Sequence, residues 1–122
     1  RCRGITDMMT KQEIFDKVAT HLLTQKKRSY ASNSCAYRGD YGGMCAVGVL
    51  ISDEFYDEKM EGSPVKDLIN DFPKACKDFS DEGSLLQALQ DIHDVWPAYE
   101  WSMRLRKCAD IFDLSSAVLE KF

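Results

Sequence analysis

The alternation of apolar and polar positions is clearest near the beginning of the chain. Between residues 14 and 23, apolar side chains recur at i, i+1, i+4, i+5, i+8 and i+9, which places them on one broad face of an α-helix. Thr10 and Glu13 precede this run with the spacing of a capping box, in which each side chain accepts a hydrogen bond from the other's backbone amide. The pattern predicts an amphipathic helix from Thr10 to about Gln25 that lies against a core.

The pattern changes between residues 34 and 51. Residues 35–38 and 44–51 flank a short segment with three glycines, which supply the positive φ angles of a hairpin turn. The second arm is apolar at nearly every position, which predicts a strand covered on both faces, and Gly48 within it indicates a bulge or a close approach by another backbone. Because an isolated hairpin is not stable in water, we expect helices to pack on it.

The rest of the chain predicts helices. A short helix is expected after Ser52 and is stopped by Gly62, and a second begins at Pro64 and is broken by Pro73. Later helices are expected between residues 83 and 97, around residues 101–112, and as a further turn within residues 115–122. The expected fold class is therefore α+β, a mostly helical single domain packed on a small two-stranded antiparallel hairpin.

Chain length and composition agree with a single domain. The chain has 122 residues, of which 44% are hydrophobic and 30% are charged, a balance typical of a globular protein. Residues 9–122 are expected to form this domain, whereas residues 1–8 show no periodicity and are interpreted as a leader or cloning-derived segment. The longest apolar run has eight residues, far fewer than the ~20 that span a membrane, so no membrane contact is expected.

The net charge of the chain limits the class of partner that it can bind. The formal net charge of −4 lacks the basic excess of a protein that binds nucleic acid directly. Residues 53–94 contain four basic and twelve acidic side chains, a net charge of −8. The sequence is thus polarised, with its acidic groups concentrated in the middle of the chain.

The five cysteines, at positions 2, 35, 45, 76 and 108, form neither a CxxC pair nor a zinc-binding spacing. We expect reduced thiols, a cytoplasmic location, no metal and no cofactor. A disulfide between Cys35 and Cys45 across the predicted turn is the alternative.

One pair of residues could support nucleophilic catalysis. Cys45 follows two glycines soon after the predicted turn, and His93 lies in a later helix with Asp94 or Asp91 nearby. A nearby histidine lowers the pKa of a thiol, and a carboxylate orients the imidazole, so the two residues could form a catalytic pair. The competing interpretation is that Cys45 is buried and inert in its apolar run.

Two further features suggest recognition. The expected hairpin tip carries aromatic and basic side chains of the kind that anchor interfaces, namely Tyr37, Arg38 and Tyr41. Five acidic residues between 53 and 61 follow helical spacing, which would place them on one face, with Asp57, Glu58 and Glu61 as the candidate binding residues. A solvated face of an ordinary amphipathic helix explains the same spacing without any partner.

Four stretches, residues 10–25, 35–51, 53–62 and 85–94, resemble a family of small proteins of bacteria, phages and other mobile elements. The most specific part is the motif C-x-Y-R-G followed by C-A-V-G-x-L-I, which here begins at Cys35 and ends at Ile51. The next residue is Ser52, where members of the family typically have proline. The resemblance implies a bacterial or phage cytosolic setting and brings no established activity.

The sequence thus favours a non-enzymatic accessory protein of a phage or bacterial mobile element that binds a host protein. A small cysteine-dependent enzyme that uses Cys45 and His93 is one alternative, and an acidic mimic of nucleic acid that inhibits a basic protein is another. Large apolar side chains in the last third of the chain could also form the contact of a homodimer.

Overall fold

The computed structural model describes residues 9–26, 30–31, 34–35, 37–39 and 43–122. Its α-helices are α1 (Lys11–Gln25), α2 (Val65–Asp71), α3 (Pro73–Cys76), α4 (Gly83–Val95) and α5 (Trp101–Ile111). Short 3-10 turns connect them: η2 (Gly48–Leu50), η3 (Asp53–Phe55), η4 (Glu58–Met60), η5 (Ser80–Glu82), η6 (Ala98–Glu100) and η7 (Ala117–Lys121). The protein is therefore mainly helical.

The first helix forms as its pattern predicts. Thr10 Oγ1 accepts the Glu13 amide at 3.1 Å, and Glu13 Oε1 accepts the Thr10 amide at 2.9 Å, so the capping box is complete. The predicted apolar face is buried along its whole length: Ile14, Phe15, Val18, Ala19, Leu22 and Leu23. The helix ends at Gln25, and Lys26 follows in the left-handed region with φ of 59°.

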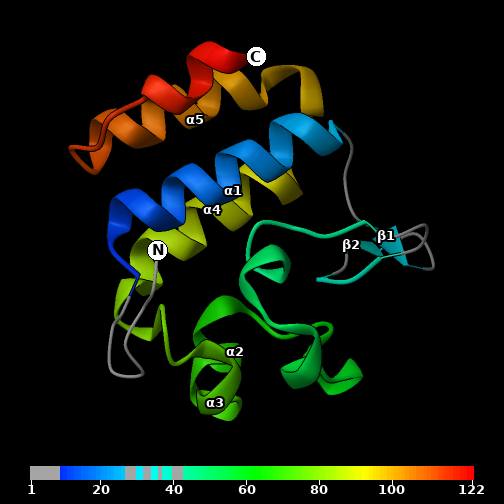
Figure 1. The fold of residues 1–122 in the computed structure, drawn as a ribbon. Coiled ribbons are helices and arrows are strands. Elements are labelled where there is room, and N and C mark those ends of the chain that lie inside the picture. Colours follow the sequence, from blue (N-terminus) through cyan, green and yellow to red (C-terminus); the bar gives the residue numbers. More distant parts are fainter. Residues whose placement is uncertain (1–8, 27–29, 32–33, 36, 40–42) are drawn as a thin grey trace.

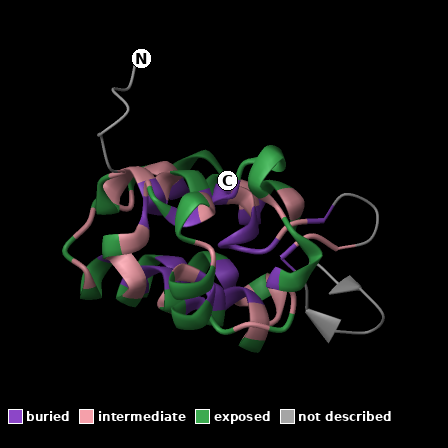
Figure 2. Cartoon of the chain, turned by 90° about the horizontal axis from the view of Figure 1, so that it is seen from below, coloured by how far each residue is buried: buried purple, intermediate pink, exposed green. Residues whose placement is uncertain are grey.

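The long helices pack around α4. This helix contacts α1, α2 and α5, while α1 also contacts α5, η2 and η7. Figure 1 shows the axes of α5, α1 and α4 roughly aligned in one half of the molecule, with α5 running opposite to α1, and it shows α2 and α3 in the other half. The buried residues form one hydrophobic cluster, which lies on the inward sides of these elements (Figure 2).

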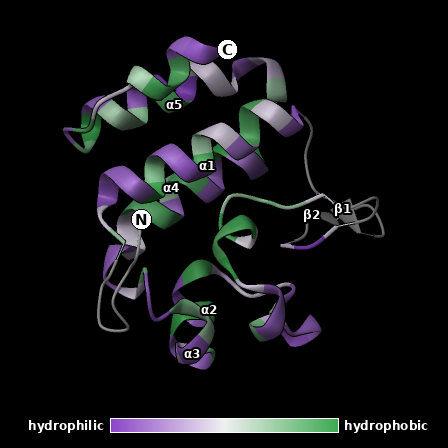
Figure 3. Cartoon of the chain, viewed as in Figure 1, coloured by the Kyte–Doolittle hydropathy of each residue, from purple (hydrophilic) through white to green (hydrophobic). Residues whose placement is uncertain are grey.

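The predicted hairpin, and with it the α+β class, is wrong. Residues 44–51 do not form a strand: Val47 has helical dihedral angles and residues 48–50 form the turn η2, which Figure 3 shows as largely hydrophobic. Within the described residues, strand pairing is limited to β1 (Tyr30–Ala31) and β2 (Ser34–Cys35), where residue 30 pairs with 35 and residue 31 with 34. A single antiparallel bridge from Arg38 to Met44 is what remains of the expected pairing.

The reason lies in how the apolar run becomes buried. A run without alternation is compatible with any fully buried backbone, and here the chain curls inward instead of pairing. Cys45, Ala46, Val47 and Ile51 are buried within the hydrophobic cluster. The predicted close approach at Gly48 is confirmed, since a Cβ atom there would lie 2.0 Å from the carbonyl oxygen of Tyr37.

The single helix expected after Ser52 is also replaced. Two turns, η3 and η4, flank extended residues at Tyr56 and Asp57, so the acidic residues do not share one helical face. The later predicted helices are confirmed as α2, α4 and α5, and the predicted turn within residues 115–122 is η7. No helix among the described residues is both long enough and apolar enough to cross a membrane.

The contact at Gly48 gives a stability prediction. We expect Gly48→Ala to lower the free energy of unfolding by about 3 kcal/mol or more, because its methyl group would overlap backbone rather than a flexible side chain. Gly83→Ala is the control, because its Cβ would meet only Ile69 Cδ1 at 3.8 Å, an ordinary van der Waals contact. Urea denaturation of both variants tests the contact, and equal stabilities would refute it.

Candidate functional site

The Cys45 thiol lies in the interior. Its side chain is fully buried, and its sulfur accepts a hydrogen bond from the Gly48 amide at 3.3 Å. Burial raises the pKa of Cys45 to about 12, so the thiol is protonated at neutral pH. Cys45 is a free thiol, and the side chain of Cys35, its partner in the alternative disulfide, lies outside the described part of the structure.

His93 is equally enclosed. It has no exposed surface, its ring stacks on Trp101 with centroids 5.6 Å apart, and its Nδ1 lies 2.7 Å from Asp94 Oδ1. Gln90 joins this group to the Cys45 segment, because it donates to Asp94 at 2.9 Å and accepts the Val47 amide at 3.1 Å. The expected histidine–carboxylate contact therefore exists, but the His93 ring has no exposed surface, whereas the Asp94 side chain is 36% exposed.

Burial and a high thiol pKa are the opposite of what activates a cysteine nucleophile. The geometry thus gives no support to the alternative in which Cys45 and His93 form a catalytic pair. Among the described residues, no group of three or more His, Cys, Asp or Glu side chains is placed to hold a metal ion.

Thiol alkylation tests this conclusion. At a pKa of about 12, on the order of one Cys45 side chain in 10⁵ is a thiolate at pH 7. We expect iodoacetamide to leave Cys45 unmodified in the native protein and to modify it in urea, as read by peptide mass spectrometry. Cys76 and Cys108, which are also buried with raised pKa values of about 11, serve as internal references. Selective modification of Cys45 in the native protein would contradict this conclusion and support the alternative of a cysteine-dependent enzyme.

Two side chains of α1 hold the Met44 backbone. Gln25 accepts the Met44 amide at 2.9 Å and donates to the Met44 carbonyl at 3.0 Å, and His21 Nε2 donates to the same carbonyl at 2.7 Å. Burial lowers the pKa of His21, and the proximity of His93 lowers it further, against the opposing effect of the Met44 hydrogen bond.

This lowered pKa predicts acid sensitivity. The unfolded chain takes up a proton at His21 near its ordinary pKa of 6.5, before the folded chain does, so stability is lost as the pH falls below that value. We expect the urea midpoint to decrease less between pH 8 and pH 5 in His21→Gln, which keeps an N–H donor for Met44 but does not titrate. Parallel pH profiles for the two proteins would contradict the assignment to His21.

A second cluster holds the segment that precedes α2. We call it the Glu61 bracket: Glu61, Tyr37, Arg38, Tyr56 and Asp53. Glu61 accepts the amides of Tyr37 and Arg38 at 2.9 and 3.0 Å, and the Tyr56 hydroxyl at 2.5 Å. One carboxylate thus ties the 37–38 backbone to the 56–61 segment.

Arg38 and Tyr37 complete the Glu61 bracket from the other chain segment. The Arg38 guanidinium donates to Asp53 at 2.7 Å and to the Ile51 carbonyl at 2.5 Å, and it lies 5.0 Å from the Tyr56 ring centroid. The Tyr37 hydroxyl donates to the Ser63 carbonyl at 2.5 Å, and the side chain is only 6% exposed. Tyr37 is therefore an internal residue, contrary to its expected place at an exposed tip.

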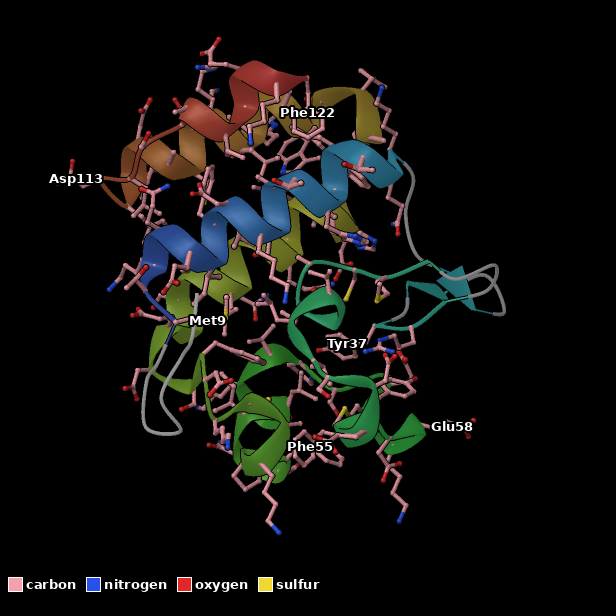
Figure 4. The ribbon with its side chains drawn as sticks, in the orientation of Figure 1. Met9, Tyr37, Phe55, Glu58, Asp113 and Phe122 are labelled. Carbon is pink, nitrogen blue, oxygen red and sulfur yellow. The ribbon has the colours of Figure 1, made fainter. Side chains whose placement is uncertain are left out.

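The predicted binding residues thus divide into two groups. Tyr37, Arg38 and Glu61 are committed to internal contacts, whereas Asp57 and Glu58 are exposed. Figure 4 shows Tyr37 inside the molecule and Glu58 at its outer edge. Tyr41 lies outside the described residues.

The Glu61 bracket leaves an ordered acidic surface facing solvent. We call residues 53–61 the acidic segment; its exposed carboxylates belong to Asp53, Glu54, Asp57 and Glu58. The Asp53 side chain is 94% exposed although it pairs with Arg38. This pair borders a groove of about 1190 Å³ between α1 and the backbone of residues 49–53, so the acidic segment adjoins a recess in the surface.

Sequence reasoning did not assign roles to Gln25, Gln90 or Tyr56. Gln25 and Gln90 bond to the backbone of Met44 and Val47, which are distant in sequence, and no local spacing predicts such contacts. Tyr56 donates to Glu61, five residues further along the chain. No protein-family model, curated protein or solved structure matches the chain.

Proposed function

We propose that the chain is a non-enzymatic binding protein whose acidic segment holds a basic host protein. The observation that carries the proposal is the combination of an exposed acidic segment with an internal bracket that fixes its backbone. Asp57 and Glu58 extend into solvent, while Glu61 and Arg38 join the ends of the segment to the body of the protein. The resemblance to proteins of phages and mobile elements supports a bacterial cytoplasmic setting.

An ordered surface of this kind suits a charged partner. Close carboxylates of one sign attract basic groups and accelerate encounter with them. A backbone that is fixed before binding loses less conformational entropy when the partner arrives, so more of the attraction contributes to affinity. The bracket therefore gives the carboxylates a defined arrangement that a mobile acidic loop would lack.

The acidic mimic of nucleic acid receives less support from the same segment. The mimic and the binding of a basic protein were both predicted from carboxylates on one helix face, and the two separate turns η3 and η4 interrupt that row. A basic protein that recognises a compact group of carboxylates requires no such repeat.

Charge reversal tests the proposal. The wild-type chain, the pair Asp57→Lys/Glu58→Lys, and a control pair Asp71→Lys/Asp91→Lys are immobilised and used to capture proteins from a bacterial lysate. All four substituted positions are exposed, and both variants change the net charge equally. We expect at least one basic protein to be captured by the wild type and the control, and about tenfold less by the acidic-segment variant.

Salt and fold controls complete the experiment. The captured protein should elute as salt is raised to about 0.5 M, because screening weakens contacts between exposed charges. Circular dichroism and urea denaturation confirm that both variants are folded. Capture of the same proteins in the same amounts by all three chains would refute the acidic segment as the binding surface.

A further inference from the structure

A small cavity lies at the end of the acidic segment, where Glu61 comes close to α4. Its volume is about 280 Å³. The residues that line it come from three separate parts of the chain: Tyr37, Glu61, Gly62, Ser63, Pro64, Gln90 and Asp94. We call it the Asp94 pocket. None of these described residues is basic, so the pocket presents two carboxylates to a ligand and no positive charge.

The wall of the Asp94 pocket includes two polar residues that are almost completely buried. Tyr37 is 6% exposed and Gln90 is 7% exposed. Gln90 donates to Asp94 Oδ1 at 2.9 Å and accepts the Val47 amide at 3.1 Å. The Tyr37 hydroxyl donates to the Ser63 carbonyl. These bonds hold the wall in place before a ligand arrives, which lowers the entropic cost of binding.

The two carboxylates of the pocket differ in what they offer a ligand. Glu61 uses both of its oxygens, which accept two backbone amides and the Tyr56 hydroxyl. In Asp94, Gln90 and His93 both contact Oδ1, and Oδ2 has no hydrogen-bond partner among the described residues. Neither carboxylate pairs with a lysine or arginine in the described part of the chain. Asp94 Oδ2 is therefore the available acceptor, and the charge of Glu61 adds to the negative potential around it.

The Tyr37 hydroxyl senses both carboxylates. Burial raises the pKa of Tyr37, and the charges of Asp94 and Glu61 are among the causes that raise it further. The phenolic oxygen that donates to Ser63 can also accept a hydrogen bond. The pocket thus combines negative charge with acceptors on more than one wall, which favours a cation that carries several N–H donors.

We infer that the Asp94 pocket binds the guanidinium group of an arginine side chain of the basic partner. A guanidinium has five N–H donors in a planar fork and is weakly hydrated, whereas a lysine ammonium is a compact and strongly hydrated charge. Its bond to a carboxylate is about twice as strong as a bond between neutral groups. The inference rests on the proposed function, because the arginine belongs to the protein that the acidic segment binds. Asp57 and Glu58 then attract the partner, and the pocket fixes its register.

A blocked arginine tests the chemistry of the pocket. Nα-acetylarginine amide is titrated into the ¹⁵N-labelled chain at constant ionic strength, and the amide resonances are followed by NMR. We expect the resonances of Gly62, Ser63 and Asp94 to shift together, with a Kd in the millimolar range because the ligand is small. Nα-acetylcitrulline amide has nearly the same shape and no charge, so it should bind at least about fivefold more weakly.

Asp94→Asn is the variant that removes the proposed contact. Asparagine keeps an acceptor oxygen for Gln90 but lacks the charge, so the affinity for the blocked arginine should fall at least about fivefold. Asp91→Asn is the control, because Asp91 is an exposed residue of the same helix that does not line the pocket. Circular dichroism and urea denaturation verify that both variants are folded. Equal affinities of the wild type and Asp94→Asn, or no shift of the pocket resonances in the wild type, would overturn the inference.

Capture from a bacterial lysate tests the source of the arginine. Both asparagine variants keep the whole acidic segment, and we expect Asp94→Asn to capture at least about fivefold less of the basic protein than Asp91→Asn does. Equal capture by the two variants would overturn the assignment of the arginine to the partner. Capture by the wild type without binding of the blocked arginine would overturn the pocket and leave the proposed function standing.

Discussion

The rest of the structure depends on how a buried backbone without a strand partner satisfies its hydrogen bonds. Most of residues 44–51 are buried in the core, where an amide or carbonyl group without a hydrogen bond lowers the stability of the fold. Backbone bonds within the turn and to Tyr37 satisfy some of these groups, and side chains satisfy others: Gln25 binds both polar groups of Met44, and Gln90 accepts the Val47 amide. Because these glutamines come from α1 and α4, the same contacts that make the segment possible also fix the two helices around it.

Glu61 applies the same solution to the neighbouring backbone of residues 37–38. Its two oxygens accept the successive amides of Tyr37 and Arg38, a role that a carbonyl of a paired strand could otherwise fill. The distinction between structural and available carboxylates follows from this contact. Glu61 is engaged in holding the backbone, which fixes the position of Asp57 and Glu58 while leaving their side chains exposed.

The sequence predicted those parts of the fold that depend on local periodicity or on local end signals. Signals within a few neighbouring residues predict the apolar face of α1 and its capping box. Signals of the same kind predict the ends of α4 near Gly83 and Pro97. The hairpin prediction was wrong because the apolar run at residues 44–51 has no periodicity. Such a run does not distinguish a buried strand from a buried turn. The candidate site was predicted only in part: exposure of Asp57 and Glu58 could be expected from their charge, but the internal role of Glu61 depends on residues more than twenty positions away.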